Sequence, residues 1–252
     1  MHNSKFINES DARLPLLSDA VMYGAGLFET FRSRSGKRLL FKEKHVDRLM
    51  RSILETGLKF GIERNQILLD LDTILQMGPE QEQVIKIYAC DGQCFITSKN
   101  WTPQLKKNEA VNLLIVSGGR TNAQWKSSSY FDSLIAWRDA QNQGYYDALF
   151  IDQQGYVLEN SRSNFFWAKE GIVYTEKNNV LPGITRDFIM NQKDVPTQWG
   201  KITYSEVESC DELFLSNAVA GIVPVKSVTH KLKKIIIKSG PITKYLSDLL
   251  GY

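Results

Sequence analysis

Five short segments of this chain combine reactive residue types at spacings that are unusual for purely structural sequence. They are Tyr23-Gly-Ala-Gly-Leu-Phe-Glu-Thr-Phe-Arg32, His45-Val-Asp-Arg-Leu49, Trp125-Lys-Ser-Ser-Ser-Tyr130, Glu159-Asn-Ser-Arg-Ser-Asn-Phe-Phe166 and Leu181-Pro-Gly-Ile-Thr-Arg186. Each has an ordinary explanation by itself, because a lone lysine is usually a solvated surface side chain and a lone glutamate an exposed strand end. Together they supply an amine, carboxylates and guanidinium groups, which can bind an anion and move protons.

The segment 181–186 has the sequence of a helix start that could bind an anion. Ile184 and Thr185 follow a Pro-Gly pair, and the free backbone N–H groups of a first helical turn suit a phosphate. A plain helix cap explains the same residues, and the two interpretations are compatible. Arg48 could bind a phosphate as well, since a guanidinium offers paired donors to phosphate oxygens. The alternative for Arg48 is a surface helix arginine, although its neighbour Leu49 lies on the apolar face.

These segments belong to a chain whose hydrophobic periodicity changes several times. Alternating residues predict β-hairpins over 27–41, turning at Ser35-Gly36-Lys37, and over 84–97, turning at Asp91-Gly92. Other strands are predicted at 5–8, 111–116, 147–151, 156–158, 163–168, 172–175 and 212–215. Helical spacing predicts helices over 46–58, 67–75, 130–141 and 241–250, and a further helix opened by the segment 181–186.

The order of these elements indicates an α+β fold in two domains. Hairpins and helices come first and many short strands follow, which does not match regular βαβ units. The stretch 117–124 is polar, rich in glycine and the best candidate for a linker. We therefore predict a smaller α+β domain over 1–117, a linker over 118–124 and a larger α/β domain over 125–252. Lys126 lies just after the linker.

Composition disfavours several other classes of protein. The 252 residues include 31 Lys and Arg against 28 Asp and Glu, and the basic residues are spread along the chain, so no nucleic-acid stripe is visible. The cysteines and histidines lack the spacing of a disulfide framework or a metal site, which fits a reducing compartment. No apolar stretch approaches the length of a membrane span. A G-x-G-x-x-G turn and a Walker loop are both missing, which disfavours dinucleotide and P-loop enzymes.

In this order and spacing, the five segments resemble the class IV aminotransferases. This family depends on pyridoxal 5′-phosphate (PLP) and includes branched-chain and D-amino-acid aminotransferases and aminodeoxychorismate lyase. The resemblance runs from Asp19 to Val225. It implies the two-domain PLP fold of type IV, PLP as cofactor, a small amino substrate and a cytoplasmic homodimer that needs neither nucleic acid nor membrane.

The resemblance also implies roles for individual residues. Lys126 would bind the cofactor aldehyde and later move protons, and Glu159 would keep the pyridine nitrogen protonated. Tyr130 would contact the phenolic oxygen of the cofactor, and Thr30 would assist Lys126. The groups expected around the phosphate are those of Arg48, Ile184, Thr185, Asn217 and Ala218. The residues expected near the substrate are Tyr23, Phe28, Arg32, Lys86 and Asp91.

Details of the motifs favour a lyase that converts 4-amino-4-deoxychorismate to p-aminobenzoate and pyruvate, a step toward folate. The segment 126–130 is similar to the K-S-L-N-Y of these lyases, and 217–225 looks more like their N-S-L-x-G-x-x-P-V than the G-T-A turn of branched-chain enzymes. The compact length also suits a lyase. One departure is Asp91, where lyases and D-amino-acid aminotransferases commonly have an arginine that meets a substrate carboxylate. An acidic residue would repel that group, so either Lys86 or Arg32 replaces the arginine or the substrate differs.

Other functions stay open at this point. An amino-acid aminotransferase of the branched-chain or D-amino-acid type would use the same lysine to move the same proton. A degenerate, non-catalytic PLP-binding protein is a remote alternative, which the presence of Lys126, Glu159 and Arg48 disfavours. A basic nucleic-acid-binding module is also remote, because no motif of alternating basic and aromatic residues is present.

Overall fold

The computed structural model describes residues 1–34 and 37–251, which form two compact units. The first unit comprises Met1–Thr102 with Trp125–Tyr130, and the second comprises Pro103–Gln124 with Phe131–Tyr252. This division differs from the predicted linker at 118–124. The reason is β5 (Val111–Ser117), which pairs in parallel with strands of the second unit, so the chain enters that unit before the predicted linker. The segment Trp125–Tyr130, which includes Lys126, groups with the first unit and not with the C-terminal domain in which it was predicted.

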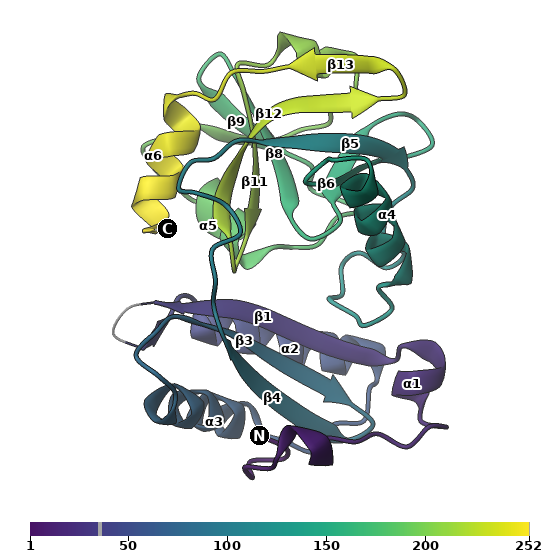
Figure 1. The fold of residues 1–252 in the computed structure, drawn as a ribbon, viewed down its shortest axis with the longest axis vertical. Helices are drawn as coiled ribbons and strands as arrows, with labels where there is room; N and C mark the ends of the chain where they lie inside the picture. The colour runs from purple at the N-terminus through teal and green to yellow at the C-terminus, as the bar shows by residue number, and fades with distance from the viewer. Residues whose placement is uncertain (35–36, 252) are drawn as a thin grey trace. The chain divides into compact units, whose positions relative to one another are not determined.

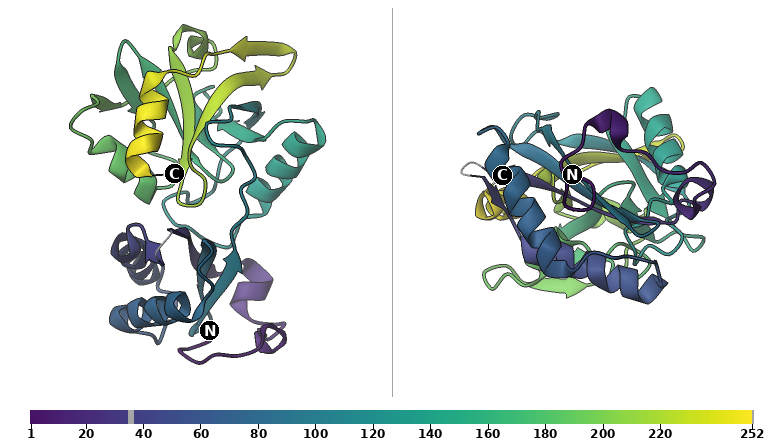
Figure 2. Two further views of the ribbon diagram at one scale, coloured as in Figure 1. Left: turned by 60° about the vertical axis from the view of Figure 1, so that its left-hand side comes forward. Right: turned by 90° about the horizontal axis from the view of Figure 1, so that it is seen from below.

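The first unit is a four-stranded antiparallel sheet in the order β2-β1-β3-β4 (Figure 1). Its strands are β1 (Gly26–Arg34), β2 (Arg38–Leu39), β3 (Gln83–Cys90) and β4 (Gln93–Asn100). Its helices are α1 (Asp19–Tyr23), α2 (Lys42–Thr56) and α3 (Arg64–Met77), after a short 3₁₀ turn at Glu9–Asp11. Helix α2 packs against β1 and α3, and α3 reaches β4, so these two helices cover one face of the sheet (Figures 1 and 2).

Both predicted hairpins and both predicted helices of this unit are confirmed. The β3–β4 turn is formed by Asp91 and Gly92, which both have positive φ, as a two-residue hairpin loop requires. The turn predicted at Ser35-Gly36 lies outside the described residues. The strand predicted at 5–8 is wrong, since Lys5 makes only an isolated bridge to His2.

The second unit is a nine-stranded sheet with helices packed on it. The strands run in the order β10-β9-β8-β11-β12-β5-β6-β7, with β13 paired to β12. Besides β5, they are β6 (Asp147–Ile151), β7 (Val157–Asn160), β8 (Asn164–Lys169), β9 (Ile172–Thr175), β10 (Thr197–Trp199), β11 (Glu212–Asn217), β12 (Gly221–His230) and β13 (Lys233–Ile236). The helices are α4 (Phe131–Asn142), α5 (Ile184–Met190) and α6 (Pro241–Leu250), with a 3₁₀ turn at Glu206–Ser209.

An additional pairing between β7 and β8 closes part of this sheet into a ring of six strands. The core lies against this ring and includes Leu113 of β5, Leu149 of β6, Phe165 of β8 and Leu213 of β11, all fully buried. The pair that joins the two strands is Glu159 and Asn164. Closure therefore fixes the position of the glutamate that the sequence singles out.

Most predicted elements of the second unit are confirmed, and β6, β9 and α6 match to the residue. The long central strand β12 was not predicted. Its residue Pro224 argues against a central strand, because proline cannot donate to a ladder. In the structure the ladder to β5 begins at Val225, one residue after the proline.

All three cysteines lie in the protein interior. Cys90, Cys94 and Cys210 are free and buried, and burial raises the pKa of Cys94 to about 12, so its thiol is unreactive. No helix within residues 1–34 and 37–251 has the length and apolar character needed to cross a bilayer. The same residues hold no group of three or more His, Cys, Asp or Glu side chains arranged for a metal ion.

Candidate active site

The backbone around Lys126 is fixed on the edge of β1 in the first unit. The Phe28 N–H donates to the Lys126 carbonyl at 2.9 Å, and the Ser128 N–H donates to the Gly26 carbonyl at 2.8 Å. Ser127 bridges to Leu27 between them. The segment of Lys126 thus continues the sheet, and the Lys126 Nζ lies 4.6 Å from the centre of the Phe28 ring.

Several predicted site residues gather around Phe28. In the antiparallel ladder Thr30 is opposite Lys86, and cross-strand partners share a face of the sheet. The Lys86 Nζ lies 4.6 Å from the Phe28 ring centre, and Tyr130 meets the same ring edge-on at 6.1 Å. Partial burial lowers the pKa of Lys86. The outcome is a surface with two amines, two aromatic rings and the hydroxyl groups of Thr30 and Tyr130.

The opposite face of β1 holds a buried carboxylate that the sequence analysis gave no role. Glu29 is 1% exposed. It accepts hydrogen bonds from Nε and Nη2 of Arg48, both at 2.7 Å, and its Oε2 lies 2.7 Å from Nδ1 of His45. Because side chains alternate along a strand, Glu29 points toward α2 while Phe28 and Thr30 point away. His45 and Arg48 are three residues apart and therefore share a face of α2, but no sequence signal connects them with Glu29 of β1.

The cluster stays ionised at the carboxylate and neutral at the imidazole. Burial by itself would raise the pKa of Glu29, but the charge of Arg48 and the hydrogen bonds from His45 and Arg48 outweigh it and lower the pKa from 4.5 to about 2. Burial lowers the pKa of His45, against the opposing pull of Glu29. Arg48 therefore points inward, and Glu29 fixes the plane of its guanidinium.

Glu159 is the corresponding buried carboxylate of the second unit. It lies in β7, one residue before the end of the strand and opposite Asn164 of β8, and its Oε2 accepts hydrogen bonds from Asn164 Nδ2 at 3.1 Å and from the Leu181 N–H at 3.0 Å. Nη1 of Arg120 lies 3.7 Å from Oε1. A buried carboxylate held in this way suits a protonated ring nitrogen, which needs an anionic acceptor. The donor set therefore fits the pyridine end of PLP.

Asn164 also ties Glu159 to the start of α5. Its Nδ2 donates to the Leu181 carbonyl at 2.9 Å, and a Cβ at residue 183 would collide with its Oδ1, so only glycine fits there. Ile184 is half-buried and Thr185 is buried at the first positions of α5. The proposed phosphate residues thus follow a turn that is attached to Glu159.

Asn217 and Ala218 lie at the end of β11. Oδ1 of Asn217 accepts the N–H groups of Val219 at 2.8 Å and Ala220 at 2.7 Å, and Nδ2 donates to the Ser163 hydroxyl at 2.9 Å. The Asn217 side chain therefore builds the turn that carries Ala218.

Two predicted substrate residues, Arg32 and Asp91, have structural partners, and a third, Tyr23, is exposed. Arg32 donates to Glu82 through Nε at 2.9 Å, and its guanidinium stacks 3.3 Å from the Trp101 ring centre. Asp91 occupies the β3–β4 turn, and its Oδ2 accepts the Ala20 N–H of α1 at 3.3 Å. Tyr23 ends α1 with 73% of its surface exposed.

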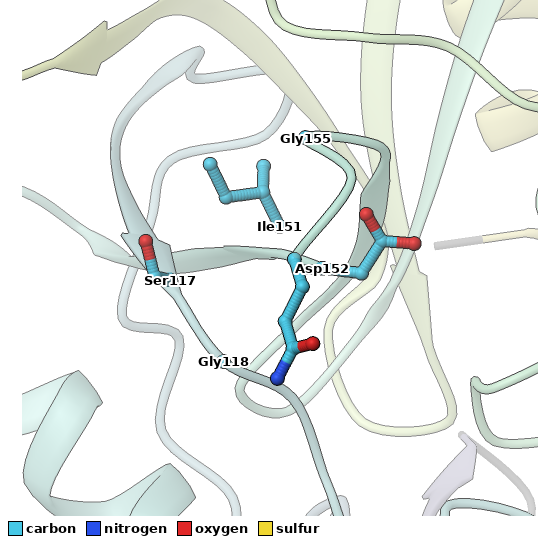
Figure 3. A pocket seen from close by; sticks show the side chains of 6 residues that line it. Ser117, Gly118, Ile151, Asp152 and Gly155 are labelled. Carbon is cyan, nitrogen blue, oxygen red and sulfur yellow. The ribbon is translucent and has the colours of Figure 1, made fainter.

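A separate cavity of about 570 Å³ lies in the second unit at the ends of β5 and β6 (Figure 3). It is lined by Ser117, Gly118, Ile151, Asp152, Gln153 and Gly155, none of which is a predicted site residue. Oδ1 of Asp152 accepts the N–H groups of Gln154 and Tyr156, so this carboxylate serves the β6–β7 turn.

Glu29→Gln should destabilise the protein strongly, because it leaves the buried guanidinium of Arg48 without its carboxylate. Breaking one partner of a buried pair costs about 3–5 kcal/mol of unfolding free energy. Urea unfolding at pH 7 measures this change. Asp47→Asn is the matched control, because it removes an exposed carboxylate paired with Arg64 and should cost below about 1 kcal/mol. Equal losses in both variants would contradict the assignment.

The stability difference between the wild type and Glu29→Gln should depend on pH. The folded pKa of Glu29 is about 2, below its ordinary value of 4.5. Its contribution is therefore present above the unfolded pKa and is lost as the pH falls toward 2. Unfolding series between pH 6 and pH 3 should show the difference shrinking on acidification. A constant or growing difference would refute a carboxylate that is ionised in the folded state.

Comparison with known proteins places the chain in a family. Residues 26–228 match the family described as "Amino-transferase class IV". The aminodeoxychorismate lyase of Bacillus subtilis is 26% identical and covers 90% of this chain and 85% of its own. The structure of a Thermoproteus uzoniensis branched-chain aminotransferase with norvaline superposes with a TM-score of 0.90 at 23% identity, covering 99% of this chain and 92% of its own.

A proposed 4-amino-4-deoxychorismate lyase from Legionella pneumophila is 27% identical with a TM-score of 0.84 and covers 97% of each chain. The fold expected from the sequence, mixed α and β structure of the aminotransferase type, is thereby confirmed. Members of this family use PLP. The family match over most of its length makes this chain a PLP-dependent enzyme of the class IV aminotransferase family.

Proposed function

We propose that this enzyme is an aminodeoxychorismate lyase, which releases p-aminobenzoate and pyruvate from 4-amino-4-deoxychorismate. The observation that carries the proposal is the pair of amines, Lys86 and Lys126, each 4.6 Å from the Phe28 ring centre. The substrate has an amine, an unsaturated ring and two carboxylates. One lysine is needed for the chemistry, which leaves Lys86 as a cation for a carboxylate beside an aromatic ring. A branched-chain substrate would place hydrocarbon against that charge.

The sequence supports the same reaction. The segment 126–130 and the stretch 217–225 resemble lyases more than branched-chain enzymes, and the relative in Bacillus subtilis is a lyase. The departure at Asp91 is compatible with this proposal, because Asp91 serves a turn and its carboxylate accepts the Ala20 N–H of α1. We further propose that the enzyme works in the cytoplasm as a homodimer and supplies p-aminobenzoate for folate.

We propose the following residues as the PLP-binding groups. Lys126 holds the aldehyde, Glu159 accepts the pyridine N–H, and Tyr130 contacts the phenolic oxygen. The phosphate ligands come from Arg48, Ile184, Thr185, Asn217 and Ala218. Bound PLP supplies an electron-withdrawing ring that stabilises negative charge at the neighbouring carbon.

The chain's own residues then move one proton. Lys126 removes the proton from the amine-bearing carbon of the substrate, which lets enolpyruvate leave and the ring become aromatic. Lys126, assisted by the hydroxyl of Thr30, returns the proton to the leaving group, which becomes pyruvate. Lys86 holds a substrate carboxylate during both transfers.

An amino-acid aminotransferase is the second candidate, supported by the TM-score of 0.90 with the Thermoproteus enzyme. It would use Lys126 for the same first proton removal, and with bound PLP carrying the amino group to an acceptor keto acid the products would be a new keto acid and a new amino acid. Lys86 would then favour an acidic substrate.

The lyase and the aminotransferase can be separated by their products. Purified enzyme should be yellow and should release p-aminobenzoate from aminodeoxychorismate, with little keto acid formed from leucine or D-alanine. Borohydride followed by peptide mapping should place the cofactor on Lys126, and Lys126→Ala should be inactive. Turnover of leucine or D-alanine without p-aminobenzoate release would overturn the lyase proposal. An adduct on another lysine would overturn the role of Lys126.

Lys86→Ala should raise KM for aminodeoxychorismate by about tenfold or more, the value of one lost charge contact. Lys86→Arg keeps the charge and should stay close to wild type. Lys99→Ala is the matched control, because Lys99 is an exposed lysine of β4 in the same sheet and should leave KM unchanged. Steady-state kinetics of all three variants decide the point, and equal KM values for Lys86→Ala and Lys99→Ala would remove Lys86 from the site.

A further inference from the structure

A buried arginine without a role in the proposed function lies beside Glu159. Arg120 has a side chain 8% exposed, and its Nη1 is 3.7 Å from Oε1 of Glu159, whose side chain is 5% exposed. This separation is too long for a hydrogen bond between these two atoms but lies within the range of an ion pair, which is screened little because both side chains are buried. The sequence analysis assigned this stretch to a linker, whereas it belongs to the second unit.

The two oxygens of Glu159 have different partners. Oε2 accepts two hydrogen bonds from neutral donors, Asn164 Nδ2 and the Leu181 N–H. The cation of Arg120 lies on the side of Oε1. The neutral donors fix the direction of the carboxylate, and the guanidinium supplies the charge that balances it. Orientation and charge are thus provided by different residues.

Two glycines precede Arg120 and allow the backbone to reach this position. Gly118 follows β5 with a φ of +136°, which side-chain-bearing residues rarely adopt, and its N–H donates to the Ile151 carbonyl at 2.9 Å. A Cβ on Gly119 would come within 3.0 Å of Cδ1 of Leu158. The chain therefore passes closely against β7, one residue before Glu159. Bulkier residues would move Arg120 away.

We propose that Arg120 is a positioning residue that keeps Glu159 ionised and aimed for the pyridine nitrogen of PLP. Burial disfavours a charged carboxylate, and an adjacent guanidinium favours it. A neutral Glu159 could not balance a protonated ring. Arg120 thus acts on the cofactor through Glu159 and not by contact with the substrate. This inference rests on the proposed role of Glu159.

A double-mutant cycle on PLP affinity tests the proposal. Apo-enzyme is titrated with PLP, and Kd is followed by quenching of tryptophan fluorescence. Arg120→Gln should raise Kd by about tenfold, and Arg120→Lys should recover most of the loss. The double variant with Glu159→Gln should bind PLP no more weakly than Glu159→Gln by itself. The visible absorption band of bound PLP should change alike in Arg120→Gln and Glu159→Gln.

Arg162→Gln is the matched control, because Arg162 pairs with the buried carboxylate of Asp147 through Nε at 3.1 Å in the same unit. It should lower the melting temperature without changing Kd or the absorption band. The proposal would be overturned if Arg120→Gln bound PLP with the wild-type Kd. It would also be overturned if the increases in Kd caused by Arg120→Gln and Glu159→Gln multiplied in the double variant. If Arg120→Gln does not fold, Arg120→Met keeps the side-chain length, and a wild-type Kd there is equally decisive.

The same titration separates this inference from the proposed function. A wild-type protein that binds no PLP and gives no borohydride adduct would overturn the assignment of the cofactor site. A wild-type protein that binds PLP on Lys126, with Arg120 variants unchanged, would overturn only the role of Arg120.

Discussion

The first unit is organised by the need to neutralise one buried carboxylate. Glu29 loses its hydration in the interior, and the attraction of Arg48 compensates for this only because both guanidinium bonds measure 2.7 Å and His45 adds a third partner. These contacts attach α2 to β1 in one register. Since side chains alternate along β1, the register that turns Glu29 toward α2 turns Phe28 and Thr30 to the other face. The surface beside Lys126 is therefore a consequence of the pairing beneath it.

The second unit also contains a buried carboxylate, which lies where its sheet closes into a ring. The pairing of β7 with β8 at Glu159 and Asn164 completes a ring of strands around an apolar core. It also leaves a buried carboxylate at the seam, with Asn164, the Leu181 N–H and Arg120 around it. The carboxylate and its donors come from separate strands and loops, so the ring has to form before they meet. A rigid scaffold of this kind suits a group that must be aimed at a cofactor nitrogen.

We expect substrate specificity to depend on which cationic side chains are already paired with other residues of the protein. Arg32 is stacked on Trp101 and paired with Glu82, whereas Lys86 lies against Phe28 on the face that carries Thr30. This arrangement favours Lys86 over Arg32 as the replacement for the arginine that related enzymes have near Asp91. It also removes the difficulty that Asp91 posed, because a turn position with positive φ and a helix-capping carboxylate account for that residue.

The sequence by itself determined the family, the cofactor and most of the secondary structure. The order of the motifs can be read directly from the sequence. The hydrophobic periodicity of a helix or a strand depends only on residues close together in the chain. It did not reveal the partner of Arg48, the strand β12 with its proline, or the place of Arg120 beside Glu159. Those features depend on which faces of two elements meet. Glu29 and Arg48 are 19 residues apart, and Arg120 and Glu159 are 39 apart. Only the tertiary structure decides such pairs, because the cost of burying a charge is set by the neighbours that folding supplies.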